Sequence, residues 1–313
     1  MEFSIFRLTF DKGVHIGEGS LEDHGIILHA DTIFSALCIE ALNMGGEPHL
    51  NRLLTLAGGD TFFLSDAFPY AQGEYYVPKP VVKPRINLED NDPSAKKVFK
   101  KMKYIPLDKL DDYFRGVINA DAARDMADGL DEKLGKSSLV ARAAVRTGDE
   151  TLPYHVGIFT FRKGAGLYII TGGDEASLTI LRGLFSGLAY SGVGGKRTSG
   201  LGRFTVVEEP VPNSIAERLT GTYPAYMTLC ASMPNEAETE TVMANITYTL
   251  LRRSGYVLSD TYADDPLRKK DFYLFNSGAV VSKKYIGGIF DVSNGGAHPV
   301  YRYAKPLFMG VTP

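Results

Sequence analysis

The chain has 313 residues, enough for two domains of ordinary size, and 44% of them are hydrophobic, which supports buried cores and excludes a disordered chain. Its formal net charge is −3, which excludes a globally basic protein, so any nucleic-acid surface must be local. Cys38 and Cys230 lie far apart, which argues against a disulfide framework and favours a cytoplasmic location. The N-terminal residues alternate and carry charges, and no apolar run approaches the about 18 residues of a spanning helix, so we expect neither a signal peptide nor a membrane partner.

The first part of the chain predicts a strand, a glycine-marked turn and a helix. Residues 3–10 are rich in β-branched and aromatic side chains, which favours a strand, and the turn follows at 13–19. Asp31 is expected to cap a helix over about 32–43, where apolar residues recur at helical spacing, and Gly45-Gly46 is expected to end it. This order is the first half of a ferredoxin-like unit.

A basic segment follows at residues 79–103. It holds eight cations and three acids, a difference of +5 within 25 residues of a chain that is net negative. Lysines four apart, such as Lys96 and Lys100, repel one another on a helix, and a polyanion across that face would relieve the repulsion. The segment is therefore a candidate surface for binding a polyanion. The alternative is an ordinary solvated basic face.

The middle of the chain is less informative. Residues 104–151 carry no recognisable motif, although Arg142 and Arg146 lie within them. Both arginines are candidates to stack on or read RNA bases, because guanidinium planes serve that purpose in single-stranded RNA recognition. Residues 155–161 and 166–171 are predicted to form strands that pair with each other.

Apolar residues at helical spacing predict a helix over residues 174–190 with one buried stripe. This helix leads into a glycine-rich loop, and a strand over 203–208 follows. The loop, residues 190–204, holds five glycines, three cations and three hydroxyl side chains, with no acid. Glycines let the backbone approach a ligand, and successive N–H groups can form a concave anion site. The loop follows a helix, so the helix dipole has the wrong sign, and the loop's own N–H groups and cations must hold a phosphate. The alternative is a flexible hairpin with incidental charge.

Residues 209–212 read as a linker to a second, smaller, β-rich domain. Strands are expected at 223–232, 248–253, 256–259, 271–276, 279–282, 288–292 and 300–310, with a helix at about 236–246. We therefore predict an α+β chain of two domains. The first, 1–209, contains the glycine-rich loop (190–204) and the basic insertion (79–103), and the second spans 213–313.

Several stretches resemble a known family. The loop SGVGGKRTSGLGRF resembles that of the RAMP superfamily, repeat-associated RNA-binding proteins of CRISPR systems. HIGEGSLEDHGIILHADTIFSAL (15–37) is similar to the family's N-terminal turn and first helix, and LSDAFPY with YYVPKPVVKP (64–84) to its lysine- and proline-marked segment. RRSGYVLSD, KKDFYLFNSGAVVSK and HPVYRYAKPLFMGV, between 252 and 311, are similar to its C-terminal domain. Together they resemble the fourth Csm subunits of type III-A CRISPR interference complexes.

The resemblance implies two ferredoxin-like (RRM-like) domains and a non-catalytic RNA-binding role in antiviral defence. Such subunits hold the repeat-derived 5′ tag of the crRNA and dock both the large polymerase-type subunit and a backbone RAMP subunit. No cofactor and no metal is expected. The implied RNA-binding positions in the loop are Ser191, Gly192, Gly194, Gly195, Lys196, Arg197, Thr198, Ser199, Gly200, Gly202 and Arg203. The turn residues His15, Gly17, Gly19 and Ser20 and the lysines Lys79 and Lys83 are carried over with them. Tyr190 and Phe204 are further candidates to stack on bases.

Two other functions stay open. His15 could serve as general acid or base of a metal-independent crRNA-processing endoribonuclease, because imidazole titrates near neutral pH. The loop could instead bind a mononucleotide in an enzyme, but it lacks the following helix and the downstream acid of the dinucleotide fingerprint.

His29 and His298 are expected to be structural. For partner contacts, the aromatic candidates are Phe290, Tyr301, Tyr303 and Phe308, unless they form their own domain's core.

Overall fold

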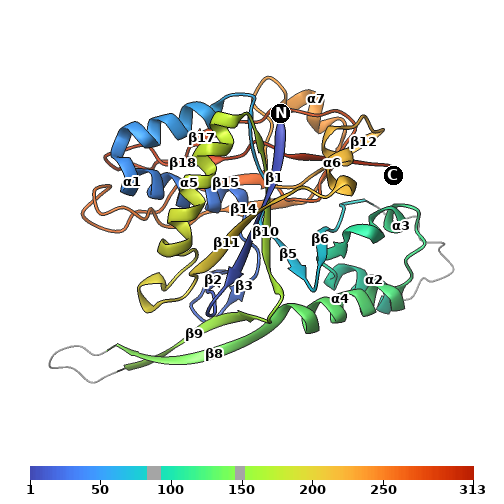
Figure 1. Ribbon diagram of the computed structural model, residues 1–313, viewed down its shortest axis with the longest axis horizontal. Helices are drawn as coiled ribbons and strands as arrows, with labels where there is room; N and C mark the ends of the chain where they lie inside the picture. Colours follow the sequence, from blue (N-terminus) through green and yellow to red (C-terminus); the bar gives the residue numbers. More distant parts are fainter. Residues whose placement is uncertain (83–92, 145–151) are drawn as a thin grey trace.

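A mixed α/β architecture is seen in the computed structural model, which describes residues 1–82, 93–144 and 152–313 (Figure 1). The larger sheet has the strand order β11-β1-β10-β5-β6-β7, with β4 also paired to β10, and its pairings are antiparallel. Its strands are β1 (Glu2–Phe10), β4 (Phe62–Leu64), β5 (Phe68–Ala71), β6 (Glu74–Pro78), β7 (Tyr104–Pro106), β10 (Ala165–Gly173) and β11 (Phe204–Pro210). The predicted strands at 3–10, 166–171 and 203–208 are therefore confirmed.

Two helices, α1 (Ala30–Gly58) and α5 (Glu175–Ser191), pack against each other beside this sheet. The apolar stripe of α5 is buried as predicted, and Phe185 stacks on Phe6 of β1 with ring centroids 4.6 Å apart. Asp174 caps α5, its side chain accepting from the Ser177 N–H at 2.8 Å.

The ends of α1 correct two predictions. The residue before the first turn of α1 is His29, and Asp31 lies within that turn, where its carboxylate pairs with distant arginines and does not cap the helix. Gly45 and Gly46 do leave helical geometry, Gly46 with φ +64°, but they kink the helix and do not end it. The helix resumes and continues to Gly58.

A helical insertion leads into a long two-stranded arm. The insertion consists of α2 (Pro93–Lys101), α3 (Leu110–Phe114) and α4 (Ala120–Leu134), with a small apolar core of its own. The arm consists of β8 (Gly135–Ala144) and β9 (Leu152–Phe161) and projects from the molecule (Figure 1). The predicted pairing of 155–161 with 166–171 was wrong, because β9 pairs with β8, and β10 pairs with β1, β4 and β5.

The C-terminal part forms a second sheet of order β13-β16-β12-β19 and two separate ribbons. The sheet strands are β12 (Ala225–Thr228), β13 (Ile246–Thr247), β16 (Val280–Val281) and β19 (Phe308–Val311). The ribbons pair β14 (Leu250–Arg253) with β15 (Phe272–Phe275), and β17 (Ile289–Asp291) with β18 (Tyr301–Tyr303). Helix α6 (Asn213–Thr220) was not predicted, and α7 (Thr239–Met243) is shorter than expected.

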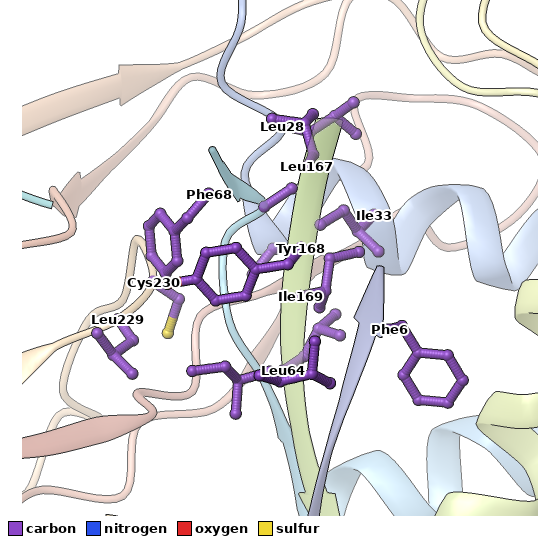
Figure 2. Close-up of a cluster of buried hydrophobic side chains, with 14 of the residues drawn as sticks. Phe6, Leu28, Ile33, Leu64, Phe68, Leu167, Tyr168, Ile169, Leu229 and Cys230 are labelled. Carbon is purple, nitrogen blue, oxygen red and sulfur yellow. The ribbon is translucent and has the colours of Figure 1, made fainter. Parts of the chain in front are cut away.

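One apolar core runs through both parts of the chain. Figure 2 shows Tyr168 of β10 beside Phe68, with Leu229 and Cys230 from the C-terminal part lying in the same cluster. Asp66, fully buried, accepts hydrogen bonds from the backbone N–H groups of Ala30 and Ala231 and from His29. The two parts therefore share an interior, and the boundary at 209–213 stays a prediction. In the ranges described, none of the helices has the length and apolarity needed to cross a bilayer.

Candidate nucleic-acid interface

The glycine-rich loop is shaped by residues with left-handed backbone conformations. Helix α5 ends where Gly192 takes φ +76°, and Gly194, Gly200 and Gly202 have φ between +75° and +80°. At Gly202 an added Cβ would lie 1.9 Å from the carbonyl oxygen of Val193, so packing as well as backbone conformation requires glycine. A single 3₁₀ turn, η2 (Arg197–Ser199), forms the tip.

Several loop N–H groups already donate within the protein. Val193 N–H donates to the Gly202 carbonyl at 3.0 Å, Gly195 N–H to His15 at 2.8 Å, and Gly202 N–H to Gly13 at 3.1 Å. The expectation that the loop's N–H groups form an anion site was therefore wrong for these three. The last two of these bonds hold the loop against the turn that contains Gly13 and His15. Phosphate contacts must come mainly from side chains.

The loop's side chains divide between solvent and protein. Thr198, Ser199 and Arg203 are exposed, and the Lys196 ammonium lies 4.9 Å from the ring centroid of Tyr154 on β9. Ser191 points inward, where its hydroxyl hydrogen-bonds Glu40 at 2.8 Å.

The two aromatic residues that flank the loop differ in exposure. Tyr190 is 81% exposed, so its ring is available to a base. Phe204 is 4% exposed and packs on Phe10, so the suggestion that it stacks on bases was wrong.

His15 is a packing residue at the centre of this region. It is 5% exposed, and its Nδ1 lies 2.7 Å from the carbonyl oxygen of Gly157 on β9. A Cβ added to Gly195 would lie 2.7 Å from the imidazole Cδ2, so the ring fills the space beneath the loop. His15 thus joins the loop to the arm. An imidazole buried and hydrogen-bonded in this way is poorly placed for proton transfer to RNA.

The rest of the 15–20 turn faces acidic groups. Gly17 lies beside the imidazole Nε2 of His15, and the Ser20 hydroxyl donates to Asp23 at 3.0 Å. Gly19, at φ +121°, is exposed. A hollow of about 580 Å³ beside the turn is lined by Glu18, Glu22, Asp23, His24 and residues 137–139 of β8. Burial, and next the neighbouring His15, lower the pKa of His24, so this hollow carries net negative charge near neutral pH.

The basic insertion lies away from the loop. Lys79 is half-buried and its ammonium donates to the carbonyl oxygen of Phe99, so it anchors α2, and burial lowers its pKa. Figure 1 shows α2 and α4 on the side of the molecule opposite the loop. The exposed lysines of α2 therefore form a separate surface. Lys83 and Arg146 lie outside the described residues.

The arm is the part of the region that the sequence did not reveal. Loop residue Leu201 packs with Val156 and Ile158 of β9, so loop and arm form one continuous surface. Arg142 lies on β8 opposite Tyr154. Exposed and half-buried residues alternate along 138–143, but the exposed ones are the apolar Leu139, Ala141 and Ala143, so no polar–apolar alternation marked this strand in the sequence.

The described residues offer no group of three or more His, Cys, Asp or Glu side chains placed to hold a metal ion. The arrangement of one exposed and two partly exposed cations, two exposed hydroxyls and one exposed tyrosine in the loop is suited to holding a polyanion with splayed bases.

Comparisons with known proteins identify relatives of the chain. The family model described as "CRISPR Csm4 C-terminal domain" matches residues 222–311. The chain is 40% identical to the "CRISPR system Cms protein Csm4" of Mycobacterium tuberculosis (strain ATCC 25618 / H37Rv), over 99% of this chain and 98% of that protein. It is 34% identical to the Streptococcus thermophilus protein of the same name, over 98% of each.

Solved structures share the fold. One chain in the structure of the Csm3-Csm4 subcomplex of the type III-A CRISPR-Cas interference complex is similar to this chain, with a TM-score of 0.68, 16% sequence identity and 100% of both chains covered. One chain in the structure of a Csm1-Csm4 cassette in complex with pppApA is also similar, with a TM-score of 0.63, 19% identity, and 100% of this chain and 98% of that one covered.

Proposed function

The chain belongs to the Csm4 family, and we propose that it binds the 5′ repeat tag of the crRNA in a type III-A CRISPR complex without cutting it. The observation that carries the proposal is the loop itself. The loop sequence contains cations and hydroxyls and no acid, and hydrogen bonds through His15 hold the loop against the base of the projecting arm. Cationic and hydroxyl side chains donate to phosphate oxygens, and the arm offers an adjacent surface for the RNA strand.

We assign the roles as follows. Lys196, Arg197 and Arg203 contact phosphates, and the hydroxyls of Thr198 and Ser199 add direction. Tyr190 and Arg142 lie at the surface of loop and arm, where they stack on bases. The loop glycines and His15 contribute indirectly, by fixing the shape of the loop. Among the candidate RNA-binding residues, Gly17, Gly19 and Ser20 are the weakest, because the neighbouring carboxylates repel phosphate.

The proposal includes no catalytic step. The alternative endoribonuclease rested on His15, and its ring is buried against Gly195 and tied to Gly157. A general acid or base must reach the proton that it transfers.

We further propose two ferredoxin-like domains, 1–209 and 213–313, and a place between two protein partners. The solved structures of similar fold are assemblies with Csm3 and with Csm1, which motivates docking to a backbone subunit of the Csm3 type and a large subunit of the Csm1 type. Both cysteines are free thiols in the structure, in keeping with a cytoplasmic location.

The test replaces Lys196 and Arg197 together by alanine and measures binding of a 5′-tag RNA over a range of salt. Each lost phosphate contact on a single strand reduces the slope of log K against log salt by about 0.7, so the double variant should lose about 1.4 and bind about tenfold more weakly near 0.15 M salt. Arg115 and Arg124, exposed on the helical insertion, give a matched double-alanine control that should bind like wild type. Unchanged affinity and slope in the loop variant would refute the proposal.

A further inference from the structure

A hollow outside the RNA region opens at the seam between the two parts of the chain. It measures about 350 Å³ and is bounded by the start of β1, the α1–β4 connection, α6 and the segment before β19. Leu219, Leu307 and Phe308 form its apolar walls and are each less than a tenth exposed. At its rim, Met1 and Ile286 are 68% and 59% exposed, so the apolar surface continues outward.

The polar groups of this hollow are mostly cationic. Lys305 is 3% exposed, and its ammonium donates to the carbonyl oxygens of Ala57, at 2.9 Å, and Gly59. These two bonds use two of the three N–H donors of the ammonium, which also lies 5.6 Å from the ring centroid of Phe63 in the lining of the hollow. Lys284 lies at the rim, held 4.3 Å from the ring centroid of Tyr226. Asp60 is the one acid in the lining.

We propose that this hollow anchors a protein partner of the complex, through an apolar or aromatic side chain with a carboxylate beside it. The inference rests on the proposed docking role and locates one contact with a partner subunit in this hollow. Such a side chain buries itself against Leu219, Leu307 and Phe308, and its carboxylate meets Lys284 and the remaining N–H of Lys305. Two lysines against one aspartate set the sign of the partner's charge.

The size of the hollow and its exposed apolar rim favour a protein side chain as the occupant. The volume is near the lower limit for ligand pockets, enough for one or two side chains and too small for a helix face. The exposed methionine and isoleucine at the rim extend the contact, as at interfaces where one buried anchor is surrounded by water-excluding contacts. Phe308 was a partner-contact candidate in the sequence, and here it forms a wall of the hollow. Tyr303, another candidate, is fully buried in the core against Phe34.

The experiment uses Ile286→Glu and Lys284→Glu in the full chain, each at an accessible position where folding should be preserved. Leu258→Glu is the matched control, because Leu258 is 66% exposed and does not line the hollow. The Csm1-type and Csm3-type subunits of the same complex are purified separately, and the affinity of each for wild type and variants is measured by calorimetry. Thermal unfolding and 5′-tag RNA binding are recorded for every variant.

We expect both rim variants to bind one of the two subunits about tenfold more weakly or worse, with the other subunit, RNA binding and unfolding temperature unchanged. The control should match wild type. If wild type binds both subunits and the rim variants bind equally well, the anchor is overturned while the docking role stands. If wild type binds neither subunit, the docking role fails, and the anchor fails with it. A concentration-dependent dimer lost in Ile286→Glu would overturn the anchor in favour of a second copy.

Discussion

Replacing Asp31 by asparagine tests the link that joins α1 to the C-terminal part. The Asp31 carboxylate is 2% exposed and pairs with Arg253, at 2.9 Å, and with Arg302. Arg302 is itself 5% exposed, so the substitution leaves a buried guanidinium without its counter-charge. Removing one partner of a buried ion pair costs about 3–5 kcal/mol of unfolding free energy, and we expect a loss of this size at pH 7.

The pH dependence gives a second estimate. Burial alone would raise the pKa of Asp31, but the two arginines lower it to about 2 from 3.8. A pKa lowered on folding adds stability that is complete above the unfolded value and is lost as pH falls toward the folded value. A lowering of this size corresponds to roughly 2 kcal/mol of unfolding free energy, which the wild type should lose between about pH 5 and pH 2.

The assay is urea unfolding of wild type, Asp31→Asn and Asp271→Asn between pH 3 and pH 7. Asp271 pairs with Arg252 at 2.6 Å, but its side chain is 42% exposed, so this control should change stability by less than about 1 kcal/mol. The gap between wild type and Asp31→Asn should narrow as pH falls. A loss no larger than in the control, or a gap independent of pH, would refute the reasoning.

Two further predictions concern the loop and His15. Gly202→Ala should distort the loop and weaken 5′-tag RNA binding, because its Cβ would lie 1.9 Å from the Val193 carbonyl oxygen. Gly164→Ala is the control: Gly164 also has a positive φ, +80°, but has open space around it, so this variant should lose about 1 kcal/mol of stability to left-handed strain and bind RNA normally. Equal RNA binding by the two variants would contradict this account. His15→Ala should lower the unfolding temperature, because the substitution leaves a cavity at a buried site. Repeat RNA incubated in EDTA with either wild type or this variant should stay intact on a denaturing gel. Cleavage by wild type that is lost in His15→Ala would restore the endoribonuclease hypothesis.

Local patterns predicted the elements whose determinants lie close together in sequence. The apolar spacing of 174–190 and the glycines after it predicted α5, its capping Asp174 is adjacent, and the loop emerged where expected. The same logic failed at Asp31. An aspartate before an apolar helical pattern resembles an N-cap, but its partners Arg253 and Arg302 lie more than 200 residues away, and nothing local indicates them.

The site was predicted in the same uneven way. The composition of the loop indicated which side chains are suited to binding phosphate. It carried no information on the loop's backbone N–H groups, two of which donate to the carbonyl oxygens of Gly13 and His15. Lys79 looked like a free cation, and only the tertiary structure places the Phe99 carbonyl against it. The arm's register across β8 and β9 likewise depends on pairing that no short segment specifies.

The central claim is that the loop and arm hold the 5′ tag of the crRNA. Its most direct test is ultraviolet cross-linking of the assembled complex with crRNA, followed by mass-spectrometric identification of the peptides joined to the tag. The account predicts cross-links at Tyr190 and Tyr154 and within residues 196–203. Tag cross-links confined to the helical insertion, or to no part of this chain, would contradict it.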